Sequence, residues 1–349
     1  MSANSTYVAP VLPIDGRLGH LTQEQTVKLQ QFWVRLYDIF DGKTPFDQTA
    51  PSSFKGQARE DGDGETPAPA KTGWFGRGKA ASESNGAVAA PRFTGAELHK
   101  TFWKLTMMDH PDLIVLKFIR ARKWVLDDAL KMFLNALKWR IVERLDELVE
   151  LSDVELDAKY PKFIEQMRIG KGYLRGADPL GRPMSVVNTR LHHKSDQPAE
   201  TIHRFTLYLI QPLLDPVVAS KFVFTRNNAE LHKVVPRERL PIIHYEGLDD
   251  WKYQYVPSQE GENDCMKDHA KKEELLAERH AIEARFDAVT RTWIKSADGK
   301  NNVERDDIAK EFREQYTRMS PYIRATSLYK RWGVAVNGEV NWTYNVKAE

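Results

Sequence analysis

Asp112 to Arg140 read DLIVLKFIRARKWVLDDALKMFLNALKWR, and the spacing of the apolar residues predicts two helices here. In the second half, large apolar side chains recur at the three- and four-residue intervals of one helical face: Leu130, Phe133, Leu134, Leu137 and Ile141. Asp127 and Asp128 come just before them, where carboxylates favour the positive end of a helix. The second half is therefore an amphipathic helix that needs a partner surface.

The first half of this stretch carries another apolar stripe and a run of cations. The stripe consists of Leu113, Leu116, Phe118 and Ile119, and Asp112 after Pro111 is typical of a helix start. Lys117, Arg120 and Arg122 crowd near the end, where cations suit the helix dipole. On periodicity alone, these cations need do no more than cap and solvate that end of the helix.

Length and composition limit the classes of protein that the chain can represent. Its 349 residues suffice for one large or two smaller domains. Lys and Arg number 51 against 49 Asp and Glu, so the formal net charge of +2 argues against a general nucleic-acid binder. The single cysteine, Cys265, excludes an intramolecular disulfide framework. Without a signal core or an apolar run of 18 residues, we expect a cytosolic protein that does not span a membrane.

The sequence contains no arrangement of residues that is typical of catalysis or of metal binding. Neither a G-x-S-x-G nor an H-E-x-x-H motif occurs, and Cys265 has only His269 near it in sequence. His192 and His193 are adjacent, so they offer no pair at helical spacing for a metal. We therefore predict a non-enzymatic protein with no catalytic residue, no metal and no cofactor.

The N-terminal part predicts a helix segment at 1–40 and a disordered linker at 41–92. Thr22 and Gln25 match a capping box, and one helical face carries Leu29, Phe32, Trp33, Leu36 and Phe40. We expect this face to dock on the protein's own core; the alternative, a helix lying on a membrane, is less favoured because its polar face is not notably basic. The linker is rich in Gly, Pro, Ala and Ser and poor in aliphatic side chains, a composition that cannot offset the entropy of ordering.

Elements after Arg140 alternate between short strands and helices. Tyr173–Arg175 and residues 182–188, separated by Gly and Pro, predict a hairpin, and Thr201 to Ile210 a helix. Lys221 to Thr225 reads as a strand. Further on, apolar spacing predicts two long helices, through Leu276, Ile282, Phe286, Val289 and Trp293 and through Ile308, Phe312 and Tyr316. Asn337-Gly338 predicts a terminal type I′ hairpin.

Four motifs resemble the CRAL-TRIO lipid-transfer family, in particular its fungal phosphatidylinositol-transfer subgroup. They are LKFIRARKW with LKWR after it, GADPLGRPMSVVN, LPIIHYEGLDDWKYQYVPSQEGEND and SPYIRATSLYKR, between about residues 94 and 335. The resemblance implies an α/β fold with a helical N-terminal lid at 93–150 and a lipid-binding domain at 160–250. That domain would hold a mixed or parallel sheet flanked by helices, followed by a helical extension with a terminal hairpin at 251–349.

The resemblance is interrupted after about Ile210. In the family this helix is followed by further strands and helices before a PVTVSK motif, whereas here Ile210 runs almost directly into QPLLDPVVASK. Pro212 lies two residues past a strong helix, which must stop or kink there. We therefore expect an internal block to be absent, so that the lipid-binding domain is partly deleted. A gene-model error and a shortened isoform both remain open explanations.

The resemblance also implies a lipid site. The arginine and the lysine that hold the lipid phosphate in the family fall on Arg122 and Lys221, whereas the family's threonine falls on Val218. The tyrosine positions used for phosphatidylcholine fall on Leu174 and Ser185, which argues against a choline lipid. The apolar residues expected to line the pocket are Phe205, Leu209, Val218, Phe222 and Phe224. Without the resemblance, Lys221 reads equally well as a strand-edge lysine that blunts aggregation.

By this resemblance the protein is expected to carry phosphatidylinositol between membranes as a cytoplasmic monomer that contacts membranes transiently. The bound phospholipid would be its ligand, and nucleic acid is not an expected partner. Two alternatives remain open. The shortened chain could be a non-carrying interaction protein, or the pocket could hold a neutral hydrophobe, which needs no hydroxyl at Val218.

Overall fold

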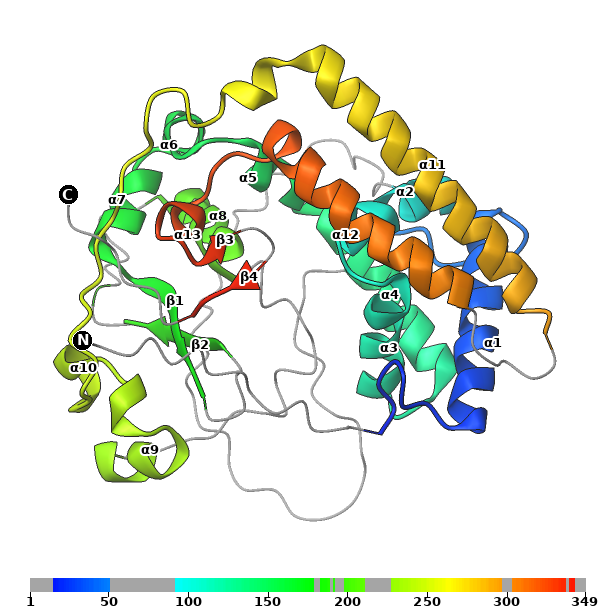
Figure 1. Ribbon diagram of the computed structural model, residues 1–349, viewed down its shortest axis with the longest axis horizontal. Helices are drawn as coiled ribbons and strands as arrows, with labels where there is room; N and C mark the ends of the chain where they lie inside the picture. Colours follow the sequence, from blue (N-terminus) through cyan, green and yellow to red (C-terminus); the bar gives the residue numbers. More distant parts are fainter. Residues whose placement is uncertain are drawn as a thin grey trace, which may run out of the picture.

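The computed structural model describes residues 15–50, 92–178, 183–188, 191, 198–210, 227–296, 303–336 and 339–342. Six helices from both ends of the chain form one body, which we call the helical body (Figure 1). They are α1 (Gln23–Phe40), α2 (Gly95–Thr106), α3 (Pro111–Ala121), α4 (Leu126–Val142), α11 (His269–Trp293) and α12 (Val303–Ile323). The two helices predicted from Asp112 to Arg140 are thus α3 and α4.

The start of each helix in this body has a local cause. Thr22 and Thr94 cap α1 and α2 in capping boxes with Gln25 and Glu97, so the box predicted for α1 is confirmed. The N-cap of α3 is His110, whose Nδ1 accepts the Asp112 N–H at 3.0 Å. Asp112 lies in the first turn, as expected, but its carboxylate is buried in the core.

The apolar face of α1 docks on the protein's own core, as predicted. Phe32 and Trp33 are fully buried; Phe32 packs on Phe133 of α4 and Trp33 on Phe102 of α2. Phe286 of α11 lies over the same ring of Trp33. The helical extension therefore closes the core that the N-terminal helices begin, and neither set of helices buries its apolar face alone.

A buried ion pair lies inside the helical body. The Arg305 guanidinium of α12 donates to both Asp112 oxygens, at 2.8 and 2.5 Å, and the Trp33 indole N–H donates to Asp112 at 2.7 Å. Burial disfavours the Asp112 carboxylate, but the charge of Arg305 and these hydrogen bonds outweigh it and hold the pKa of this carboxyl below its usual value. This pair links α1, α3 and α12.

The remaining described elements surround a short hairpin, and we call them the hairpin region. Before and within the hairpin come α5 (Leu145–Glu150), α6 (Asp153–Lys159), α7 (Phe163–Ile169), β1 (Gly172–Ala177) and β2 (Pro183–Val187). Then follow α8 (Ala199–Ile210), α9 (Asn228–Val234), a 3-10 turn (Arg237–Arg239), α10 (Ile242–Tyr245) and a second 3-10 turn (Asp264–Lys267), which carries the exposed Cys265. The chain closes with α13 (Leu328–Arg331), β3 (Ala335–Val336) and β4 (Glu339–Val340).

Both described strand pairs are antiparallel. β1 pairs with β2 in a register that sets Tyr173 opposite Val186 and Leu174 opposite Ser185, which confirms the predicted hairpin. β3 pairs with β4 across Asn337-Gly338, which confirms the terminal hairpin, although the turn residues themselves lie outside the described residues. The fold is α/β with a helical N-terminal part. Of the expected mixed or parallel sheet, the described chain holds the β1–β2 pair and a single parallel bridge between Pro241 and Asp249.

The C-terminal segment covers the edge of β1 that faces away from β2. The Leu174 N–H donates to the Tyr329 hydroxyl at 3.0 Å, and the Gly176 N–H donates to the Trp342 carbonyl at 2.7 Å. All residues of β1 up to Gly176 are consequently buried, whereas β2 alternates between exposed and buried positions. Most of the 41–92 linker, His192, His193 and the strand expected at Lys221 to Thr225 lie outside the described residues.

Candidate functional site

Arg122, the first predicted phosphate ligand, is the C-cap of α3. Its backbone N–H donates to the Phe118 carbonyl at 3.1 Å, which closes the helix, and its side chain is partly buried. Within the described part of the chain, the guanidinium has no hydrogen-bond or ion-pair partner on a side chain. A partly buried guanidinium without a carboxylate partner is available to an external anion.

The structure describes only some of the other residues predicted for the lipid site. Lys221, Val218, Phe222 and Phe224 lie outside the described residues, as does the side chain of Leu209, so the convergence of Arg122 and Lys221 stays a prediction. Phe205 of α8 is described and buried, with its ring edge-on to Phe163 of α7 at 6.0 Å between centroids. It therefore belongs to the apolar cluster beneath the hairpin, where the resemblance expects the pocket wall.

The hairpin brings together the two positions that the resemblance links to choline recognition. Leu174 of β1 lies directly opposite Ser185 of β2, with Leu174 buried and Ser185 exposed. Neither residue supplies a phenol at this place. Tyr173, next to Leu174, points into the cluster of rings formed with Trp251 and Tyr253, at 5.2 Å from each, and burial raises its pKa to about 12.

A first buried cation fixes the segment after α10 to β1. Arg175 donates from Nε and from one terminal nitrogen to the two oxygens of Asp249, both at 3.0 Å. The same guanidinium lies 4.8 Å from the ring centroid of Trp251. Two parallel hydrogen bonds from a planar guanidinium to one carboxylate fix the relative orientation of the two groups as well as the distance between them. The contact thus orients the LPIIHYEGLDDW motif against the hairpin.

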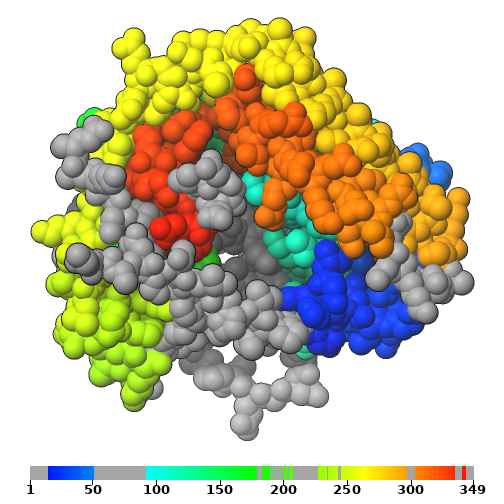
Figure 2. All heavy atoms as spheres, viewed as in Figure 1, coloured from blue at the N-terminus to red at the C-terminus, as the bar shows by residue number. Residues whose placement is uncertain are grey.

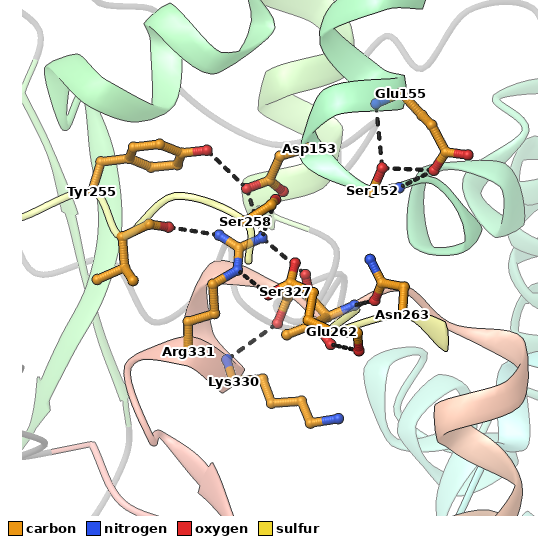
Figure 3. Close-up of polar contacts among 12 residues, drawn as sticks. Ser152, Asp153, Glu155, Tyr255, Ser258, Glu262, Asn263, Ser327, Lys330 and Arg331 are labelled. Carbon is orange, nitrogen blue, oxygen red and sulfur yellow. Dashed lines mark hydrogen bonds and ion pairs between the residues drawn. The ribbon is translucent and has the colours of Figure 1, made fainter. Parts of the chain in front are cut away.

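A second buried cation, Arg331 of α13, joins three segments that are far apart in sequence (Figure 3). Its guanidinium donates to Asp153 at the start of α6 at 2.7 Å, to Glu262 at 3.2 Å and to the Val256 carbonyl at 2.7 Å. Tyr255 adds a hydrogen bond to Asp153 at 3.1 Å. Burial raises the pKa of Asp153, although the Arg331 charge opposes this, and burial beside Asp153 raises the pKa of Tyr255 to about 12.

This Arg331 network was not predicted, although its residues lie in two motifs that carried the resemblance. Glu262 belongs to the QEGEND stretch and Arg331 to the SPYIRATSLYKR stretch. A second tie joins them, since the Asn263 side-chain oxygen accepts the Thr326 N–H at 2.7 Å. The sequence offered one signal for this network: the two motifs carry opposite charges and lie among apolar residues.

A groove lies on the helical body, and none of the residues that line it belongs to the hairpin. This open groove of about 500 Å³ lies between α11 and α12. It is lined by Arg285, Ala288, Val289, Val303, Glu304, Asp307, Ile308 and Glu311. None of these residues belongs to the predicted lipid site, and the groove is open to solvent on the outer side of the helical pair, so it is not the expected lipid pocket.

Sequence comparisons find one matching family model and several similar proteins. The CRAL/TRIO N-terminal domain matches residues 55–135, which include α2, α3 and most of α4. A phosphatidylinositol transfer protein of Eremothecium gossypii is 27% identical over 431 residues, which cover 90% of this chain and 97% of that relative. The predicted resemblance to the CRAL-TRIO family is confirmed by the match to its N-terminal domain. A CRAL-TRIO domain-containing protein of Schizosaccharomyces pombe is 27% identical over 307 residues, which cover 68% of each chain. Patellin-3 of Arabidopsis thaliana is 36% identical over 61 residues, which cover 17% of this chain and 12% of Patellin-3.

The alignment with the Eremothecium phosphatidylinositol transfer protein is longer than this chain. It runs over 431 residues, whereas the chain has 349, so it contains gaps opposite residues of the relative that have no counterpart here. An absent internal block accounts for such gaps. Its position after about Ile210 remains a prediction from the sequence motifs.

No helix in the described ranges is both long and apolar enough to pass through a membrane. Across these same ranges, no three His, Cys, Asp or Glu residues are grouped so that they could hold a metal ion.

Proposed function

We propose that this protein binds single phospholipid molecules and carries them between membranes without changing them chemically, and that phosphatidylinositol is its lipid. The CRAL-TRIO relationship supports the general activity, and the relative named as a phosphatidylinositol transfer protein supports the choice of lipid. Carriage without catalysis also agrees with a sequence that shows no catalytic motif. The proposed setting is the cytoplasm, with a monomer that contacts membranes at their periphery.

The observation that carries the proposal is the free guanidinium of Arg122. Most other arginines of the helical body with buried or half-buried side chains are neutralised: Arg305 pairs with Asp112, Arg279 with Glu283 and Arg140 with Asp146. Arg122 has no such partner among the described residues. A phosphate group supplies the charge and the oxygen acceptors that this side chain lacks, and Lys221 would be the second cation on the same phosphate.

The proposed activity requires contact with a bilayer. Moving a buried acyl chain into water costs about 0.8 kcal/mol per methylene group, so a lipid in a closed pocket does not leave through water at a useful rate. Exchange therefore takes place while the protein lies on a membrane.

The test is native mass spectrometry of the purified full-length chain. We expect a mass increment that fragments to phosphatidylinositol, and an Arg122→Ala, Lys221→Ala double variant should retain at least tenfold less of it. Arg313→Ala, which removes an exposed cation of α12, is the matched control and should retain lipid as the wild type does. Normal phosphatidylinositol retention by the double variant would contradict the site, and a neutral hydrophobe in the spectrum would replace the proposed lipid.

A second candidate function, a non-carrying interaction protein, is favoured by the length of the CRAL-TRIO alignment. Gaps opposite the relative agree with loss of interior strands, which would leave strand edges and apolar faces uncovered. This candidate predicts a purified chain that is folded but free of lipid. Transcript sequencing across codons 205 to 216 states whether the short form is made, and the mass spectrum of that form separates the two functions.

A further inference from the structure

Besides Arg122, four cations at the corner between α3 and α4 are unpaired in the described structure, and we call these four the basic corner: Arg17, Lys117, Arg120 and Lys123. In the described structure their side chains have no hydrogen bond, ion pair or ring contact. Cations near them on α1 behave differently, because Lys28 pairs with Glu24 and Arg35 with Asp127. The described part of the chain therefore leaves these four charges without a partner, whereas it pairs the neighbouring cations of α1.

The members of the basic corner lie together although Arg17 is about a hundred residues from the others. Lys117 and Arg120 are three residues apart on α3, so they share one face. Gly16, next to Arg17, lies so close that an added Cβ would be 3.0 Å from the Trp124 ring and 3.7 Å from the Arg120 side chain. Figure 2 shows the dark-blue residues before α1 against the teal surface of the α3 and α4 region.

The backbone at this corner is held in an unfavourable conformation. Lys123 and Trp124 have φ of 49° and 67°, a left-handed region in which a Cβ meets the backbone and glycine is usual. The Trp124 N–H donates to the Ile119 carbonyl at 2.9 Å, which closes the helix as such a motif does. Glycine at either position would relieve this strain. Lys123 extends into solvent and Trp124 packs back over Gly16.

Apolar side chains are exposed among these charges. Val125, directly after Trp124, is 50% exposed, and Leu113, one turn before Lys117 on α3, is 37% exposed. Two carboxylates nearby have no cation partner in the described structure: Asp128, and Asp15, which accepts hydrogen bonds from the neutral Gln25 amide. Asp127 is paired with Arg35, so the four cations of the basic corner still outnumber the uncompensated carboxylates. Cations that surround small exposed apolar groups and a tryptophan fit the boundary between anionic headgroups and acyl chains.

We propose that the basic corner docks the protein on an anionic membrane surface, with Arg17, Lys117, Arg120 and Lys123 on the headgroups and Val125 at the acyl boundary. The proposal rests on the proposed function only in that both place the protein at a bilayer. It concerns the outer surface of the bilayer and other side chains than the Arg122 and Lys221 pair that would hold the carried lipid. A single-stranded nucleic acid is the competing partner, and the test below includes it.

The test measures co-sedimentation of the full chain with vesicles of phosphatidylcholine alone or with 30% phosphatidylserine. We expect binding to the anionic vesicles that weakens in 0.5 M salt. The triple variant Arg17→Gln, Lys117→Gln, Arg120→Gln should bind them about a hundredfold more weakly, since each basic residue near such a surface contributes about fivefold. Val125→Asn, which removes the apolar side chain and leaves the charge unchanged, should weaken binding without changing its dependence on salt.

The control removes three exposed cations elsewhere, by Lys100→Gln, Lys295→Gln and Arg313→Gln. Equal loss in the control and in the triple variant would overturn the proposal, because net charge alone would then explain binding. Tighter binding of the corner to a labelled oligonucleotide than to anionic vesicles at 0.15 M salt would overturn it as well. Far-ultraviolet circular dichroism checks that the variants, all at solvent-accessible positions, keep the fold.

Lipid retention, measured by native mass spectrometry on the same samples, separates this proposal from the proposed function. A triple variant that keeps its copurified lipid but loses vesicle binding supports the basic corner. A wild type that binds anionic vesicles but carries no lipid contradicts the carrier function and leaves the docking surface standing. If the wild type carries lipid and the triple variant binds anionic vesicles as tightly as the wild type does, the docking surface is overturned and the carrier function stands.

Discussion

The helical body and the hairpin region bury their charges in different ways. In the helical body, one bidentate pair, Arg305 with Asp112, lies between long helices whose apolar faces make the core. In the hairpin region, Arg331 and Arg175 each join short elements, and the rings around Trp251 and Trp332 fill the space between them. The core of the helical body consists of apolar helix faces, whereas the short elements of the hairpin region rely on their cations to hold them together.

This difference predicts that variants in the two regions cause different kinds of unfolding. Damage to the helical body should lower the stability of the whole chain, because helices from both ends of the sequence share its core. Damage to the hairpin region should first release the C-terminal segment locally, since short elements there are held by a few long-range contacts. The following variants test that distinction.

The largest effect is expected for Arg305→Ala in the helical body. Removal of the guanidinium leaves the Asp112 carboxylate buried without its cation, which costs about 3–5 kcal/mol in the free energy of unfolding. Urea unfolding followed by circular dichroism measures it. The double variant Arg305→Met, Asp112→Leu, which removes both charges, should recover part of the loss. A loss below about 1 kcal/mol in the single variant would show that Asp112 finds water or another partner.

Arg331→Ala should have a similar cost of about 3 kcal/mol but a local outcome. Asp153 and Glu262 would lose their shared cation, and we expect hydrogen exchange to accelerate in α13 and in β3 and β4 while α1 to α4 stay protected. Lys330→Ala, which removes the exposed cation next to it, is the control. Uniform acceleration across both regions would mean that they unfold as one unit.

Two glycines give a matched pair of smaller perturbations. A Cβ on Gly95 would lie 2.0 Å from the Ile39 carbonyl oxygen in the helical body, and a Cβ on Gly247 would lie 1.7 Å from the Leu240 carbonyl oxygen in the hairpin region. Gly95→Ala and Gly247→Ala should each cost about 1–3 kcal/mol through overpacking. We expect Gly95→Ala to lower the midpoint of global thermal unfolding, and Gly247→Ala to raise protease cleavage near α10 first. The reverse order would contradict the comparison.

The smallest effect is expected at the edge of the helical body, where Asp41 after α1 pairs with Arg291 of α11. The hydrogen bonds from Arg291 lower the pKa of Asp41 from 3.8 to about 2. Because the folded value is the lower one, the carboxylate stabilises the fold above about pH 4, and this contribution disappears as the pH falls toward 2. Asp41→Asn should cost about 0.5 kcal/mol at pH 6, as half-exposed pairs do, and progressively less below pH 4. An undiminished difference in unfolding free energy at pH 3 would exclude this origin.

The two regions also differ in how far the sequence predicted them. The helices of the helical body and the capping box at Thr22 were predicted, because apolar spacing and caps are local signals. The β1–β2 hairpin and the terminal hairpin were predicted from their turns for the same reason. Local patterns did not reveal that α11 and α12 close over Trp33, since that contact joins residues more than 250 positions apart.

The candidate site was predicted only through the resemblance. Periodicity explained Arg122 as a helix cap, which it is, and gave no reason to look for a second cation at Lys221. The Arg331 network was missed because a buried ion pair has no sequence spacing of its own: Asp153 and Arg331 are 178 residues apart. The basic corner was visible as a run of cations, but the absence of partners for Arg17, Lys117, Arg120 and Lys123 could be read only from the described coordinates.

The cover of β1 by the C-terminal segment has a consequence for synthesis on the ribosome. The Leu174 N–H donates to the hydroxyl of Tyr329, which is 155 residues later in the chain, and the Gly176 N–H donates to the carbonyl of Trp342, which comes later still. At 5–20 residues per second, translation leaves that strand edge bare for roughly 10–30 s after it emerges. During that interval the exposed edge of the nascent hairpin can pair with a strand of another chain. Slow codons late in the message would therefore favour misassembly. A chaperone that covers the edge would raise the yield of folded protein.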